Sequence, residues 1–145
     1  MDYSSLSPSD YSKLYDTALD VAEEYNKFLT KEVADALNLF VYEYSKSITL
    51  AWHLTPPDID DVMQTVQERD TIHALCVELK RRGAQIAATD DIKKLDQKWQ
   101  HQILEYIRAG EVVQPYYPRP NEPLDKWWMH IESLDTVSKK NLRTL

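Results

Sequence analysis

The stretch KEVADALNLFVYEYSKSITLAWH, residues 31–53, decides the fold that this chain is expected to adopt. Apolar residues recur along it every three or four positions, which is the spacing of one face of an α-helix. That face consists of Val33, Leu37, Phe40, Tyr44, Ile48 and Ala51. A second side of the same helix carries Leu39, Tyr42 and Leu50. Because a helix that is apolar over most of its circumference is covered on most sides, we expect the C-terminal segment, a second copy of the chain or a partner to lie over it.

Three further segments show the same helical period. They are residues 8–28, 57–82 and 90–109. The only two glycines, Gly83 and Gly110, follow the last two of these segments, where a glycine readily takes the left-handed conformation that ends a helix. No stretch alternates apolar and polar residues over the length of a strand. The pattern predicts an all-α protein in which residues 1–110 form an antiparallel four-helix bundle.

The segment after Gly110 follows a different pattern. Its core, PYYPRPNEPLDKWWMH at residues 115–130, contains four prolines, which remove backbone donors and fix φ, so the proline-rich part cannot be helical. In an extended polyproline conformation residues 111–124 would reach about 43 Å, whereas a helix of twenty residues spans about 30 Å. We therefore expect residues 111–145 to form a C-terminal extension that packs on the bundle as part of a single domain and consists of an extended strap and then a short terminal helix.

The two adjacent tryptophans are expected to have different environments. On a helix, Trp127 and Trp128 point about 100° apart, so both rings cannot be buried on the same side. We expect Trp127 to anchor the strap and Trp128 to be exposed beside Tyr116, Tyr117 and Arg119. Trp, Tyr and Arg are the residue types most enriched in protein-interface hot spots. The strap is therefore predicted to present an aromatic surface to a partner.

The net charge of −7 is unevenly distributed. Residues 1–60 hold eleven acidic and four basic side chains, and residues 61–145 hold thirteen of each. A protein that binds nucleic acid directly usually shows a basic stripe, so no direct nucleic-acid contact is expected. The acidic half is interpreted as a solvated helix surface. The alternative is a patch for a basic partner, as in an acidic decoy of a nucleic-acid-binding protein.

The sequence also bears on the compartment. Cys76 is the only cysteine, so no internal disulfide can form, which is typical of a reducing environment. The N-terminus shows no basic segment followed by an apolar run, and no window approaches the ~18 apolar residues of a membrane span. We expect a soluble cytoplasmic protein with no membrane contact.

Asp70 and His73 form the strongest candidate pair for chemistry. Their spacing resembles the Glu-x-x-His element of di-iron helical bundles, and antiparallel pairing would place His101 at the same level. However, His101 falls about 180° from Ile92 and Trp99, on the outer face of its helix. We therefore expect no metal and no cofactor, and interpret Asp70 and His73 as a satisfied, half-buried pair. A metal-dependent or hydrolytic helical enzyme that uses these two residues is the alternative.

Together these patterns favour a small acidic cytoplasmic interaction module, such as an adaptor, an inhibitor or a subunit of a larger assembly, without enzymatic activity. The expected partner is another protein. Two surfaces are predicted to contact it. One comprises Tyr116, Tyr117, Arg119 and Trp128, and the other comprises Leu39, Tyr42 and Leu50. The second surface is also where a symmetric homodimer would form.

Overall fold

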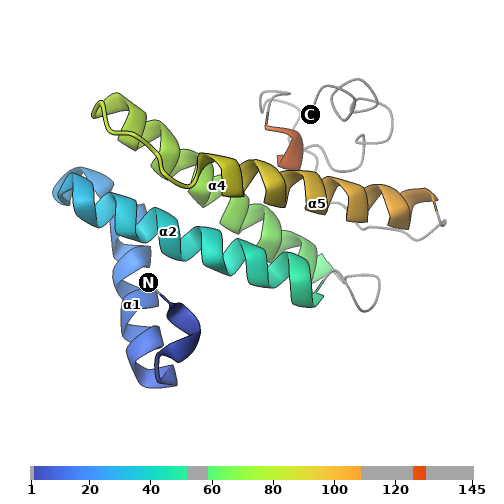
Figure 1. The fold of residues 1–145 in the computed structure, drawn as a ribbon, viewed down its shortest axis with the longest axis horizontal. Helices are drawn as coiled ribbons and strands as arrows, with labels where there is room; N and C mark the ends of the chain where they lie inside the picture. The colour runs from blue at the N-terminus through green and yellow to red at the C-terminus, as the bar shows by residue number, and fades with distance from the viewer. Residues whose placement is uncertain (1, 52–58, 109–125, 130–145) are drawn as a thin grey trace.

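The computed structural model describes residues 2–51, 59–108 and 126–129, and Figure 1 shows their arrangement. Within these residues every regular element is helical and none is a strand, which confirms the predicted all-α class. The long helices are α1 (Pro8–Glu23), α2 (Thr30–Lys46), α4 (Ile59–Arg81) and α5 (Thr89–Arg108). The short elements are η1 (Tyr3–Ser5), η2 (Tyr25–Lys27), the π-helical turn η3 (Ser47–Ala51) and η4 (Trp127–Met129).

Local sequence signals set several of the helix ends. The Ser7 hydroxyl accepts a hydrogen bond from the Asp10 amide at 3.1 Å, which is the usual N-cap arrangement. At the start of α2, the Glu32 carboxylate accepts a hydrogen bond of 2.9 Å from the Leu29 amide. Gly83 ends α4 with φ at 76°, a conformation that a residue with a Cβ rarely adopts. The first helix is shorter than predicted, since η2 follows it instead of a continuous helix to residue 28.

Helix α2 contacts all three of the other long helices. Figure 1 shows α2 and α4 running in opposite directions, as expected for a bundle, whereas α1 lies across α2. The four helices therefore pack together, but α1 does not follow α2 along its length. The crossing leaves one face of α2 only partly covered between α1 and α5.

The buried residues of α2 confirm that it is covered on most sides. Leu37 and Phe40, from the predicted core face, are 2% and 3% exposed, and Leu39, from the second side, is 3% exposed. Tyr44 is fully buried and packs edge-to-face against Trp99 of α5, with ring centroids 5.7 Å apart. The central helix thus makes apolar contacts on most of its sides, whereas the side that carries Lys31, Asp35 and Asn38 is exposed.

A buried polar network joins α2, α4 and α5. The Arg69 guanidinium of α4 donates two hydrogen bonds to the Asp96 carboxylate of α5, at 2.8 and 3.1 Å. The Tyr44 hydroxyl of α2 donates to the same carboxylate at 2.7 Å. Two donors on Asp96 offset much of the cost of removing its charge from water. This network fixes the level at which the three helices meet.

Candidate protein-interaction groove

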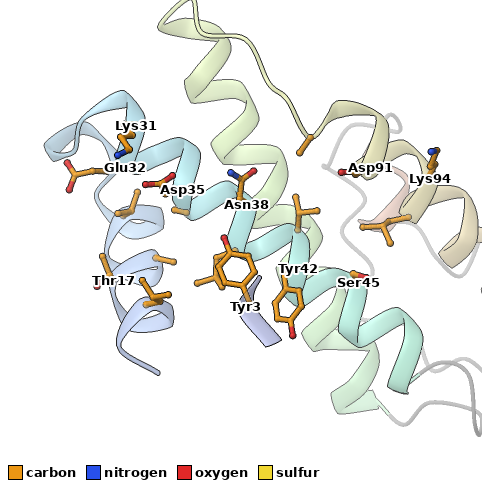
Figure 2. A pocket seen from close by; sticks show the side chains of 18 residues that line it. Tyr3, Thr17, Lys31, Glu32, Asp35, Asn38, Tyr42, Ser45, Asp91 and Lys94 are labelled. Atoms are coloured by element: carbon orange, nitrogen blue, oxygen red, sulfur yellow. The ribbon is translucent and has the colours of Figure 1, made fainter. Parts of the chain in front are cut away.

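A groove of about 980 Å³ follows the partly covered face of α2, as Figure 2 shows. Its 18 lining residues come from α1, α2, the start of α5, the turn before α5, and η1. Helix α2 forms the base, α1 forms one wall, and the first turns of α5 form the other. The groove is thus assembled from segments that are far apart in the sequence.

The floor of the groove is apolar and lined by small side chains. Ala18 of α1, Ala36 of α2 and Ala88 before α5 are 3%, 4% and 8% exposed. Leu39 and Val21 complete the floor and are 3% and 1% exposed. Because alanine leaves a shallow surface where a larger residue would fill the space, the hollow between the helices follows from these residue choices.

Aromatic rings close one end of the groove. The Tyr3 ring of η1 lies on the Tyr42 ring of α2 with centroids 5.0 Å apart, and Tyr11 lies at 6.1 Å from Tyr42. The Lys46 ammonium sits 5.1 Å from the Tyr42 ring centroid, within the range of a cation–π contact. Burial, with the nearby Asp35 charge adding to it, raises the pKa of the Tyr3 hydroxyl. The N-terminal turn is therefore part of the groove.

Charged side chains occupy the rim. Lys31, Glu32 and Asp35 project from α2, and Asp91 and Lys94 project from α5 (Figure 2). Glu32 is engaged by the Leu29 amide. No hydrogen bond or ion pair within the described residues engages the carboxylates of Asp35, on the base helix α2, and Asp91, on the α5 wall. The groove therefore combines an apolar floor with a rim that carries three acids and two bases.

A pair of buried carboxylates lies elsewhere, at the contact between α2 and α4. Glu43 and Glu68 are 9% and 6% exposed. The Ser47 hydroxyl donates to Glu68 at 2.6 Å, and the Lys46 ammonium lies 3.4 Å from Glu43. Burial raises the pKa of Glu68 to about 7, and the Glu43 charge contributes to the increase. Among the residues that the structure describes, no three His, Cys, Asp or Glu side chains are placed to hold a metal ion.

Asp70 and His73 both lie against Trp128. The Trp128 indole N–H donates to the Asp70 carboxylate at 3.4 Å, and Lys126 lies 3.6 Å from the same carboxylate. The His73 and Trp128 rings lie 5.4 Å apart between centroids. Asp70 and His73 therefore both contact the Trp128 ring, as side chains in a packed cluster do.

The expected environments of the two tryptophans are reversed in the structure. Trp128 is 2% exposed and lies under the Arg69 guanidinium, 4.1 Å from its ring centroid, whereas Trp127 is half-buried against Trp99. The prediction that Trp128 is exposed is wrong, because α4 offers this ring a cation and an acceptor for its N–H group. A ring with so little exposed surface has little area to offer a partner.

The other predicted contact residues have different positions. Tyr116, Tyr117 and Arg119 lie outside the described residues, as do most of the strap and the expected terminal helix. Leu39 is buried, as expected for a covered side of α2, but the crossing helix α1 contributes to this cover and was not among the three expected covers.

Tyr42 and Leu39 both line the groove, whereas Leu50 is 64% exposed and is not part of it. The predicted surface thus coincides with the groove in two of its residues. Sequence reasoning missed Tyr3, Asp35 and Asp91, since nothing in the periodicity of one helix indicates which other segments face it.

One property of the helices and three comparisons with known proteins complete the description. No helix in the described ranges has both the length and the hydropathy that crossing a bilayer requires. Searches of protein-family models, curated proteins and solved structures find no match to this chain.

Proposed function

We propose that this chain is a protein–protein interaction module, without enzymatic activity, whose partner binds in the groove along α2. The observation that carries the proposal is the groove itself, about 980 Å³, in which half-buried apolar side chains come from α1, α2 and α5 (Leu14, Val41 and Leu95). Grooves of this kind between helices accept the apolar face of another helix in many recognition proteins. The charged rim would then remain at the edge of the interface, which is the usual distribution in protein complexes.

The size of the groove supports a helical segment as the ligand. Along α2 the lining residues run from Lys31 to Ser45, which is about 21 Å at a rise of 1.5 Å per residue. Two turns of a partner helix span about 11 Å and therefore fit within that length. Two turns present the i, i+3, i+4 and i+7 positions that anchor a helix in an apolar groove.

The enzyme alternative draws no support from the surroundings of Asp70 and His73. Trp128 contacts both side chains, and Asp70, whose side chain is 40% exposed, also lies near the Lys126 ammonium. A catalytic pair must reach a reacting atom, and these two groups instead contact a buried indole. Their contacts favour a packing role for the pair.

Affinity capture with a matched pair of variants tests the proposal. Asn38 is exposed, lines the groove and lies on α2, so Asn38→Trp fills the groove without replacing a core residue. Asn26 is exposed on η2 outside the groove, so Asn26→Trp makes the same change elsewhere. We expect one set of proteins to be captured from lysate by the unaltered chain and by Asn26→Trp, but not by Asn38→Trp, and to bind again when purified.

Circular dichroism melting checks that both variants are folded, and Thr17→Trp, from the α1 wall, provides a second groove-filling variant. Equal capture by all four proteins would show that the groove is not the binding surface.

A further inference from the structure

We propose that the partner segment is a basic amphipathic helix, with Lys or Arg beside an apolar stripe, seated between Asp35 of α2 and Asp91 of α5. This inference rests on the proposed function and adds the chemical class of the partner. Three features of the structure support it: the small residues of the floor, the charge of the groove and its walls, and the net charge of the chain.

The floor favours an aliphatic stripe at close range. Ala18, Ala36 and Ala88 come from three different segments and are all at least nine-tenths buried. Helices approach within about 8–10 Å of each other when the side chains at the contact are small. Leu14, Val41 and Leu95 also line the groove and are only half-buried, so they offer the apolar area that Leu-, Ile- or Met-sized side chains of a partner would contact.

The rim and the adjoining wall are acidic. Three acids and two bases line the groove, and Asp35 and Asp91 face it from α2 and α5 (Figure 2). Helix α1, which forms the third side, carries four acids and a single base between Pro8 and Glu23. Asp16 and Asp20 are among these acids and are exposed. The five charged side chains of the rim sum to −1 and those of α1 sum to −3, so the charges around the groove favour a cation on the partner overall.

Helix dipoles do not reverse this preference. Helices α2 and α5 both begin beside the groove and place partial positive charge there. In the first turn of α2 the charges of Lys31 and Glu32 cancel, so the partial positive charge of that helix end remains. In the first turn of α5, Asp91 lines the groove, and its full negative charge more than offsets about half a charge at that helix end.

The net charge argues for a foreign partner over a second copy. Each chain carries −7, and eleven of its acids lie in residues 1–60, the half that contains α1 and α2. Two copies that met along this face would bring like charges together, which opposes association. A basic segment from another protein meets the same surface with attraction.

A peptide library tests the class of partner directly. The probe is a displayed library of random 16-residue peptides, selected on the full unaltered chain and counter-selected on Asn38→Trp and Thr17→Trp. We expect the enriched peptides to have apolar residues at i, i+3 or i+4, and i+7, and a net positive charge. Their affinities, measured by fluorescence anisotropy, are expected to fall as the salt concentration rises from about 50 to about 300 mM, because salt screens the attraction between exposed charges.

Charge reversals with matched controls locate the cations. Asp91 lines the groove and Asp90 does not, although both are exposed in the first turn of α5. We expect Asp91→Lys to weaken peptide binding by about threefold to tenfold, and Asp90→Lys by less than about twofold. Lys94→Glu is expected to strengthen peptide binding. Lys93 lies next to it but outside the groove, so Lys93→Glu is expected to change peptide binding little.

Different results would contradict the basic partner and the proposed function. Enriched peptides that are acidic, or equal effects of Asp91→Lys and Asp90→Lys, would overturn the basic partner and leave the groove as the binding surface. Peptides that bind the unaltered chain and both groove-filling variants equally would overturn the proposed function itself. A dimer of the unaltered chain in sedimentation, with monomeric Asn38→Trp, would show that a second copy occupies the groove and would also overturn the inference.

Discussion

At the scale of the residue, Trp128 shows how a side chain can depart from its sequence pattern. Counting 100° per residue separates Trp127 from Trp128 but cannot say which ring faces the helices. That choice depends on Arg69 and Asp70, which lie almost sixty positions earlier in the chain and meet the ring only in the folded protein. The half-buried position of His73 could be predicted from its own helix, whereas its contact with Trp128 could not.

Trp128→Ala is expected to lower the free energy of unfolding by about 3–5 kcal/mol, because it leaves a cavity where the buried indole ring was. Trp127→Ala is expected to cost less, since Trp127 is only half-buried. Trp128→Phe keeps most of the packing and loses the long hydrogen bond to Asp70, so its cost should be below about 1.5 kcal/mol. Urea unfolding measures all three, and equal losses for Trp127→Ala and Trp128→Ala would contradict the described packing.

The Arg69–Asp96 pair provides a second prediction at this scale. Its side chains are 11% and 15% exposed. Asp96→Leu is expected to cost about 3–5 kcal/mol, because it leaves the guanidinium buried without its counter-charge. The double variant Arg69→Met with Asp96→Leu is expected to recover part of that loss, since no unpaired charge then remains.

Chemical denaturation of the two single variants and the double variant gives the coupling energy between the sites. Losses that simply add would show that the two side chains do not interact.

At the scale of the element, local signals were sufficient for some boundaries and insufficient for others. Ser7 and Gly83 act through their own backbone neighbours, and both mark helix ends as expected. The end of α1 at Glu23 and the π-helical turn after α2 were not predicted. Apolar periodicity continues through both places, so nothing within those stretches indicates the break. The π-helical turn is held to α4 by the bond from Ser47 to Glu68.

Glu68 makes the junction between α2 and α4 sensitive to pH. Its pKa is about 7 in the folded protein against 4.5 for the exposed group. The protonated form is therefore favoured by folding. The stability that it contributes is fully present below pH 4.5 and is lost as pH rises through about 7. The loss for this one group is on the order of 3 kcal/mol.

Glu68→Gln is expected to remove most of this decline while keeping a partner for Ser47. Urea unfolding at pH 5 and at pH 7.5 should therefore show a smaller difference for the variant than for the unaltered chain. Glu105→Gln, at an exposed position of α5, is the control. An unchanged difference in Glu68→Gln would mean that the carboxyl is not protonated near neutral pH.

At the scale of the whole molecule, the all-α class followed from periodicity, but the groove did not. Its walls depend on how α1 crosses α2 and on where the first turn of α5 lies. Both depend on tertiary contacts among α1, α2, α4 and α5, so the sequence of α2 indicated only that something covers its second side. Leu39 and Tyr42 belong to that side and line the groove, and this is the part of the candidate site that the sequence could predict.

A segment that fills the groove should stabilise the whole fold. A peptide present at about 100 times its dissociation constant adds about 2.7 kcal/mol to the free energy of unfolding. For a chain of 145 residues this corresponds to a rise in melting temperature of roughly 5–10 °C. Differential scanning calorimetry should show the rise for the unaltered chain and for Asn26→Trp. A similar rise for Asn38→Trp would place the peptide elsewhere.

The turn between α1 and α2 is held from outside the groove. The Arg82 guanidinium, at the end of α4, donates to the carbonyls of Tyr25 at 2.8 Å and Phe28 at 2.9 Å. Both carbonyls belong to the connection between α1 and α2, so one guanidinium ties that connection to the end of α4. Arg82→Gln is expected to lower the free energy of unfolding in urea by about 1–3 kcal/mol, because it leaves two part-buried carbonyls without their donor. An unchanged free energy of unfolding would show that the two bonds add nothing to the fold.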